Sequence, residues 1–210
     1  MSVHSAAVAE HHVGVEPAET PLTPESWGKL AMWLFLAGDA MSFGGLLAGY
    51  GALRYGDPNW PKPSSILGIT LTAAMTFLLV CSSVTMVEAL AGIRQDNVAR
   101  LRTFLTLTIL GGITFLLLQA HEWTNLIVHE GQSIQRNNFG ATFFVLTGFH
   151  GMHVFSGVVY LTVILLRSLA GKYSADHNNE VEIAALYWHF VDLVWMFIFP
   201  LVYLLSVNPK

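Results

Sequence analysis

The stretch NNFGATFFVLTGFHGMHVFSGVVYLTVILL, residues 137–166, contains no Asp, Glu, Lys or Arg. A helix needs about 20 mostly apolar residues to cross the hydrocarbon core of a bilayer, so this stretch is long enough to span it. Its apolar residues run on without the alternation that barrel strands would show over about 10 residues. The stretch therefore predicts a transmembrane helix.

Four further segments of the chain have the same character. Charge-free runs cover residues 63–87, 103–121 and 193–209, and the run 30–53 is interrupted only by Asp39. We therefore predict an all-α membrane protein, a single bundle of five transmembrane helices joined by short loops. The predicted spans are residues 27–53, 66–91, 102–123, 139–166 and 183–207.

Composition supports a membrane class for the whole chain. Hydrophobic residues make up 53% of the 210 residues and charged residues 11%, and the mean hydropathy is +0.53. These values exclude an ordinary soluble domain of this size. Residues 1–26 are polar and have neither a basic start nor an apolar block, so they do not form a secretory signal. We expect a flexible N-terminal tail at 1–26 and one transmembrane domain at 27–210.

The distribution of Lys and Arg predicts the orientation. One face of the predicted bundle holds six of these residues and the other holds four: Lys29, Arg94, Arg100, Arg102, Arg167 and Lys172 against Arg54, Lys62, Arg136 and Lys210. Cytoplasmic loops carry the excess of basic residues in most membrane proteins. We expect the N-terminus in the cytoplasm and the C-terminus outside.

Several ionisable side chains fall inside the predicted spans. Asp39 lies about 15 Å inside from Lys29, and Asp192 about 13 Å from the start of the fifth helix, which enters from the same face. His150 and His153 lie near the middle of the fourth helix. An ionisable group in lipid costs about 2.5 to 3.5 kcal/mol, so such groups usually face the bundle interior and find partners. We expect these four residues to converge.

The residues alone leave several kinds of site open. A haem would need two axial ligands at matched depth, and a di-iron centre would need a repeated Glu-x-x-His motif; neither pattern is complete here. Mid-membrane acids such as Asp39 and Asp192 are typical of a proton or ion pathway, although a transporter would also tend to show an internal repeat. For the histidines we favour interhelical hydrogen bonds, worth about 0.6 to 2 kcal/mol each.

Two motifs in the last two spans resemble a known family. FGATFFVLTGFHGMHVFSG (139–157) and LYWHFVDLVWMFIFPLVYL (186–204) are similar to the last two helices of subunit III of the haem-copper oxidases, especially cytochrome c oxidase, in its short five-helix bacterial form. KLAMWLFLAGDAMSFGG (29–45) resembles the family helix that carries a membrane-buried carboxylate, and LLQAHEW (117–123) also matches. The family residue is usually Glu, whereas this chain has the shorter Asp39.

The resemblance implies an accessory subunit with no redox centre of its own. Haem and copper would lie in partner subunits of a complex in the bacterial plasma membrane that reduces oxygen to water and pumps protons. The chain would pack against subunit I, join subunit II and the other oxidase subunits, hold phospholipids, and sustain proton uptake. A larger respiratory supercomplex is a further expected partner, and no nucleic acid is.

The resemblance also suggests roles for particular side chains. We expect Asp39 to be the buried, protonatable carboxylate, and we expect no catalytic or metal-binding residue. His189 and Asp192 would pin the fifth helix to its neighbours, together with His150 or His153. The full set of expected helix-pinning or lipid-contact residues is His150, His153, Trp188, His189, Asp192, Trp195 and Glu122.

Three alternatives stay open at this point. The chain could be subunit III of a quinol oxidase, because other subunits choose the electron donor. It could be a more distant relative that accompanies nitric oxide reductases. The third alternative is an independent transporter or a membrane metalloenzyme.

Overall fold

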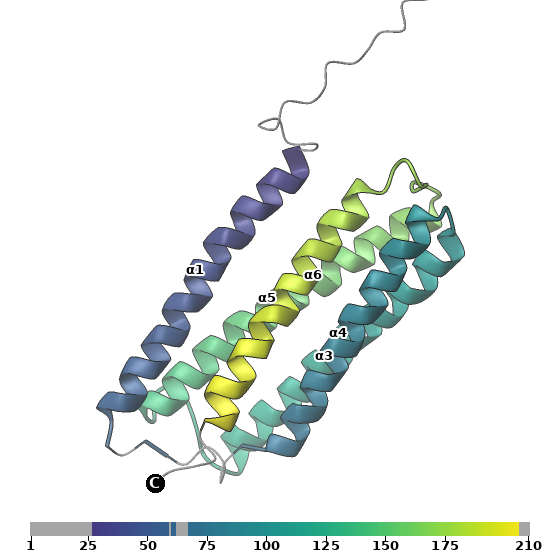
Figure 1. The fold of residues 1–210 in the computed structure, drawn as a ribbon. Helices are drawn as coiled ribbons and strands as arrows, with labels where there is room; N and C mark the ends of the chain where they lie inside the picture. The colour runs from purple at the N-terminus through teal and green to yellow at the C-terminus, as the bar shows by residue number, and fades with distance from the viewer. Residues whose placement is uncertain (1–26, 59, 62–66, 206–210) are drawn as a thin grey trace, which may run out of the picture.

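A computed structural model describes residues 27–58, 60–61 and 67–205 of the chain. The predicted tail at 1–26 lies outside these residues. The described part contains helices and no strand, as Figure 1 shows. The elements are α1 (Trp27–Gly56), α3 (Ile69–Arg94), α4 (Val98–Val128), α5 (Asn138–Leu169), α6 (Asn179–Ile198) and the π-helical segment η1 (Phe199–Leu204).

The predicted all-α bundle of five membrane-spanning helices is confirmed. Five helices in the described residues are long and apolar enough to cross a membrane. Several helices run beyond the predicted spans because side chains cap their polar ends. The Asn97 side chain accepts a hydrogen bond from the Arg100 backbone N–H at the start of α4, and the Asn137 side chain accepts one from the Gly140 N–H at 2.7 Å.

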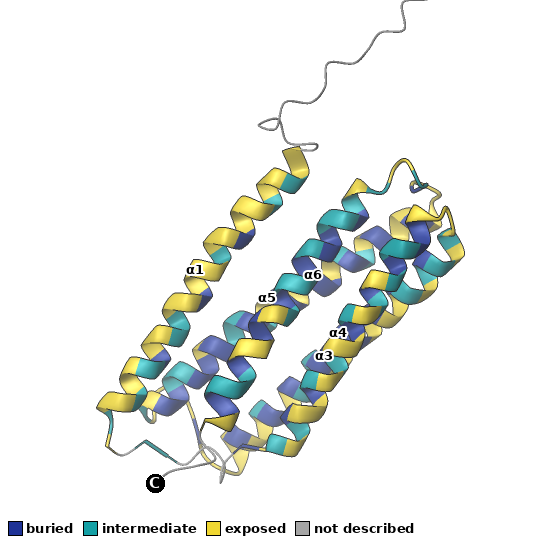
Figure 2. Ribbon diagram, viewed as in Figure 1, coloured by how far each residue is buried: buried dark blue, intermediate teal, exposed yellow. Residues whose placement is uncertain are grey.

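Helix α1 lies along one side of the bundle. In Figure 1 it runs beside α5 and α6, while α3 and α4 lie on the other side. Its buried residues are only Leu36, Phe43 and Tyr50, seven residues apart, so a single narrow stripe faces the bundle. The rest of α1 is largely exposed in Figure 2. The core therefore sits among α3, α4, α5 and α6.

Glycines let α6 approach the centre of this core. A Cβ atom at Gly112 of α4 would lie 2.6 Å from the Trp188 ring, and one at Gly157 of α5 would lie 3.0 Å from it. Trp188 is 1% exposed. Small residues at these two positions thus make the space that a buried indole of α6 occupies.

The last turns of α6 widen at a proline. Pro200 has no backbone N–H and cannot donate to the preceding turn. The chain continues as the π-helical segment η1, in which the Leu205 N–H donates to the Pro200 carbonyl at 2.9 Å. This widening turns Tyr203 into the bundle, where it is fully buried.

Candidate functional site

Asp39 of α1 faces His153 of α5. The His153 Nε2 atom lies 2.9 Å from the Asp39 Oδ2 atom, and each side chain is 10% exposed. The His153 Nδ1 atom lies 2.7 Å from the Phe149 carbonyl oxygen, which can only accept, so Nδ1 carries a proton. The two groups are close enough for an ion pair, but their geometry is not that of a hydrogen bond. The contact joins α1 to α5 inside the bundle.

His150, one turn before His153, has a different environment. It is fully buried, and neither ring nitrogen has a hydrogen-bond partner among the described residues. Its ring stacks on Trp195 with a centroid distance of 4.9 Å and meets Phe115 edge-on at 5.7 Å. Because an unpaired buried charge would be costly, a neutral ring that packs as an aromatic side chain fits this site.

His189 and Asp192 of α6 both face Ser83 of α3. The His189 Nδ1 atom lies 2.9 Å from the Ser83 hydroxyl oxygen, and Asp192 interacts with the same hydroxyl. The structure thus brings these two residues together at α3. Among the described residues this serine is the hydrogen-bond partner of His189, while the Asp192 Oδ1 atom makes no hydrogen bond; the sequence led us to expect His150 or His153.

The two tryptophans of α6 also bond to α3. The Trp188 indole N–H donates to the Ser82 hydroxyl at 3.2 Å, and that of Trp195 donates to Thr76 at 2.9 Å. Trp195 is fully buried, and Trp188 nearly so. Both rings therefore pack inside the protein and not against lipid.

Glu122 of α4 is buried between α3 and η1, with 4% of its surface exposed. The Thr72 hydroxyl donates to Oε1 at 3.0 Å, and the Tyr203 hydroxyl donates to Oε2 at 2.9 Å. Each carboxyl oxygen thus has a partner from a different element. Glu122 connects three parts of the bundle near the end where α1 finishes.

These contacts share a feature that the sequence motifs did not mark. Four hydroxyl side chains of α3, here named the α3 hydroxyl row, form hydrogen bonds with polar side chains of α4 and α6: Thr72, Thr76, Ser82 and Ser83. The signal in the sequence is weak, because Ser and Thr within apolar helices also bond to their own backbone. The intervals of four, six and one residues between them follow no helical repeat, so their spacing offered no further clue.

The ends of the helices carry ionic contacts. Glu182 of α6 pairs with Lys29 of α1 and, at 2.5 Å, with Arg94 of α3. In the loop before α6, the Tyr173 hydroxyl donates to the Glu180 carboxylate at 2.6 Å. Burial and this carboxylate raise the pKa of Tyr173 above its usual value. The tyrosine therefore stays protonated and keeps donating this hydrogen bond.

The buried polar side chains described above each contact one or two other polar side chains. Among the described residues, no group of three or more His, Cys, Asp and Glu side chains is placed to hold a metal ion. The contacts link α1 to α5, α6 to α3, and α4 to α3 and η1. Chemically, the arrangement can position helices and hold a proton at Asp39 and His153.

Comparison with known proteins finds a family model and several relatives with the same description. A family model described as cytochrome c oxidase subunit III matches residues 57–207. The chain is 34% identical over 197 residues to cytochrome c oxidase subunit 3 of Bacillus subtilis, covering 90% of this chain and 95% of the relative. It is also 34% identical to that of Thermostichus vulcanus, covering 84% and 87%, and 33% identical to that of Bacillus sp. (strain PS3), covering 85% and 86%.

Proposed function

Since the chain belongs to the cytochrome c oxidase subunit III family, and so to an oxidoreductase complex, we propose that its role there is accessory and non-catalytic. In this proposal it stabilises the catalytic subunit of a haem-copper terminal oxidase and sustains proton uptake. Haem and copper belong to the partner subunits, which reduce oxygen to water and pump protons.

The α3 hydroxyl row is the observation that carries this proposal. The polar groups of α6 bond one by one to Thr76, Ser82 and Ser83. Hydrogen bonds of this kind hold transmembrane helices in one arrangement, because lipid offers no competing polar partner. A rigid bundle of this type suits a subunit that supports a neighbour.

The partners follow from the family and from the surface of the helices. We propose direct packing against subunit I, a complex that includes subunit II and other oxidase subunits, and bound phospholipids, in a bacterial plasma membrane. The relatives compared above are bacterial and are named as cytochrome c oxidase subunits, which favours cytochrome c over quinol as the donor. A larger respiratory supercomplex remains part of the proposal.

The orientation with the N-terminus in the cytoplasm is part of this proposal as well. The ends that meet at this face are the starts of α1, α4 and α6 and the ends of α3 and α5. Basic side chains gather there, which the positive-inside rule associates with the cytoplasm. The basic residues are Lys29, Arg94, Arg100, Arg102, Arg167 and Lys172.

Gentle purification from native membranes tests the proposal. The chain should be isolated in mild detergent, everything that comes with it identified by mass spectrometry, and a reduced-minus-oxidised spectrum recorded. We expect a catalytic subunit with an oxidase haem spectrum and a copper-binding subunit II. A lone, colourless chain would point instead to a transporter, with Asp39 and Asp192 as its first candidate residues.

A further inference from the structure

Glu122 lies inside the bundle with no positive charge beside it. Its surface is 4% exposed, and none of the ion pairs in the described part of the chain includes it. The adjacent His121 is exposed, and its Nε2 atom lies 3.1 Å from the Asn125 amide nitrogen. The titratable side chains on the inner side are Tyr203 and Tyr50 of α1, which interacts with Tyr203. Because tyrosines are uncharged at neutral pH, no cation compensates a negative charge on Glu122.

Two hydroxyl groups reach the Glu122 carboxyl, and their protons can be counted. The Tyr203 hydroxyl has one proton and lies 2.9 Å from Oε2. The Thr72 hydroxyl also has one proton, but it has two acceptors in range: Oε1 at 3.0 Å and the Gly68 carbonyl at 3.1 Å. A carbonyl can only accept, whereas a hydroxyl can donate and accept at once. The contact between Thr72 and Glu122 can therefore form with its proton on either side.

An ionised Glu122 would be poorly satisfied in this setting. A carboxylate accepts hydrogen bonds at about four positions, and the two hydroxyls fill only two of them. The single Thr72 proton would be used on Oε1 and would no longer reach the Gly68 carbonyl. Burying a charge without a cation is costly, and Glu122 lies on a membrane-spanning helix. The ionised form is therefore disfavoured.

A neutral Glu122 satisfies every group of the set. With a proton on Oε1, Glu122 donates to the Thr72 hydroxyl oxygen, and the Thr72 hydroxyl donates to the Gly68 carbonyl. The Tyr203 hydroxyl donates to Oε2 as before. Both carboxyl oxygens then have a partner and no charge is buried, so the same distances are explained at lower cost.

We propose that Glu122 is a proton-binding site of this chain and holds its proton on Oε1. The hydrogen bonds then run in one direction, from Tyr203 of η1 through Glu122 of α4 and Thr72 of α3 to the Gly68 carbonyl. The site is separate from Asp39, which lies on α1 against His153. The inference concerns contacts inside this chain and does not rest on the proposed function.

Infrared difference spectroscopy of the purified complex that contains this chain detects the proton directly. The C=O stretch of a protonated carboxyl absorbs above the amide I band, away from the bands of ionised carboxylates. At neutral pH we expect the unchanged complex to show one such C=O band that is missing from Glu122→Gln. Glutamine keeps a donor and an acceptor at this position, so the variant chain should stay in the complex.

Glu88→Gln is the matched control for this measurement. Glu88 pairs with Arg100 near the opposite end of the helices, and its side chain is 37% exposed. Its replacement should remove carboxylate bands and leave the C=O region unchanged. If Glu122→Gln also removes only carboxylate bands, Glu122 is ionised and the proposal is wrong.

Tyr203→Phe gives an independent test, because it leaves Glu122 in place. The substitution removes the hydrogen bond to Oε2, which strengthens the C=O bond, so the band should shift to higher wavenumber. Tyr173→Phe removes a comparable hydrogen bond to Glu180 in the loop before α6 and should leave the band in place. A band that does not move in Tyr203→Phe would belong to another carboxyl and would overturn the assignment to Glu122.

Discussion

Asp39 and His153 are the polar contact between α1 and α5 at mid-membrane depth. With Nδ1 of His153 donating to the Phe149 carbonyl, the protonation of the pair depends on Nε2 and the carboxyl. An aspartate reaches less far than a glutamate, so α1 and α5 must lie close together for this contact to form. The formation of this contact therefore depends on how closely α1 packs against α5.

Asp39 should react with an apolar carbodiimide. Such reagents dissolve in lipid and modify protonated carboxyl groups, and the Asp39 side chain retains 10% exposure on a helix at the edge of the bundle. We expect modification at Asp39 after digestion and mass spectrometry of the labelled complex, and none at this position in Asp39→Asn. A label confined to Glu88 or Glu122 would contradict the expectation.

At the scale of single elements, α6 depends on α3. Three side chains of α6 bond to three positions of the α3 hydroxyl row: Trp188 to Ser82, His189 to Ser83 and Trp195 to Thr76. Each such bond between membrane helices is worth about 0.6 to 2 kcal/mol. Together they fix the rotation of α6, which also orients η1.

His189→Ala should loosen this connection. The substitution removes the bond to Ser83 and leaves the hydroxyl without its ring partner. We expect the subunit to leave the complex at a lower detergent concentration, with the haem spectrum of the remaining subunits unchanged. Ser83→Ala should act in the same direction.

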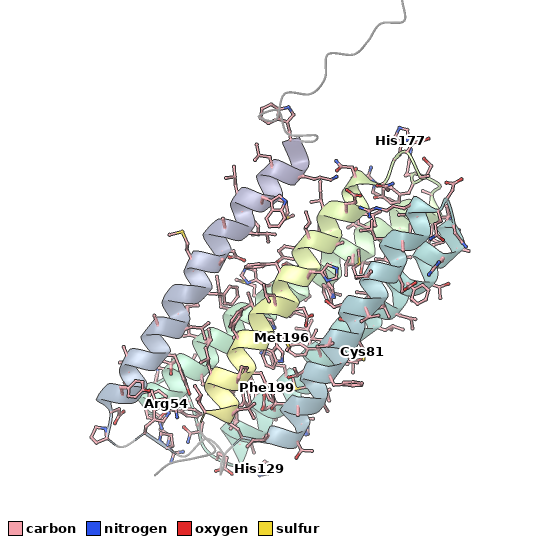
Figure 3. The ribbon with its side chains drawn as sticks, in the orientation of Figure 1. Arg54, Cys81, His129, His177, Met196 and Phe199 are labelled. Carbon is pink, nitrogen blue, oxygen red and sulfur yellow. The ribbon has the colours of Figure 1, made fainter. Side chains whose placement is uncertain are left out.

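His177→Ala serves as the control for this experiment. His177 is exposed in the loop before α6 (Figure 3), so its replacement should have no effect on retention. Loss of haem in His189→Ala would favour metal ligation by His189 and would contradict the pinning role.

Gly112→Ala should disturb the packing of α4 against α6. The new Cβ atom would lie 2.6 Å from both Trp188 and Val158, and neither a buried indole nor a β-branched side chain can move aside easily. Overpacking of this kind costs about 1 to 3 kcal/mol. We expect a lower thermal midpoint of subunit release from the purified complex. Gly45→Ala, which meets nothing within 4 Å, should leave it unchanged.

The elements of the fold could be predicted from the sequence to a large extent. Long charge-free runs mark membrane helices because lipid excludes both charge and unpaired backbone. The partners of particular side chains could not be predicted in the same way. They depend on how each helix is rotated, and apolar residues around its whole surface give no amphipathic stripe to fix that rotation. Hence Ser83 was not anticipated as the partner of His189, nor the aromatic setting of His150.

The structure at the end of α6 could not be predicted from the sequence either. Pro200 marks an interruption in the sequence, but a kink, a helix end and a wider turn are all compatible with it. The structure has the wider turn, and with it Tyr203 reaches Glu122. Motif resemblance identified the family because it compares whole patterns and does not require helix rotations.

At the scale of the whole molecule, α1 has the fewest buried residues of the five described membrane-spanning helices. It is connected to the rest of the bundle by polar contacts at three depths: Lys29 with Glu182, Asp39 with His153, and Arg54 with the carbonyls of Leu201 and Leu205. Three hollows, of about 420, 200 and 420 Å³, lie between α1 and α6 among these contacts.

Within the described residues, the buried polar side chains named above join one helix to another. In a complex that contains this chain, the account predicts that electron transfer and oxygen chemistry reside entirely in the partners. A complex that lacks this chain should then lose activity sooner and take up protons less well, while its haem content stays the same.

The most direct test is to purify the oxidase from cells that lack this chain and to measure haem per catalytic subunit, together with the reduced-minus-oxidised spectrum. The account predicts unchanged haem content and band positions, with activity that declines sooner during turnover than in the complete complex. Loss of a haem or a shifted haem band in the complex without this chain would contradict the claim that it is accessory.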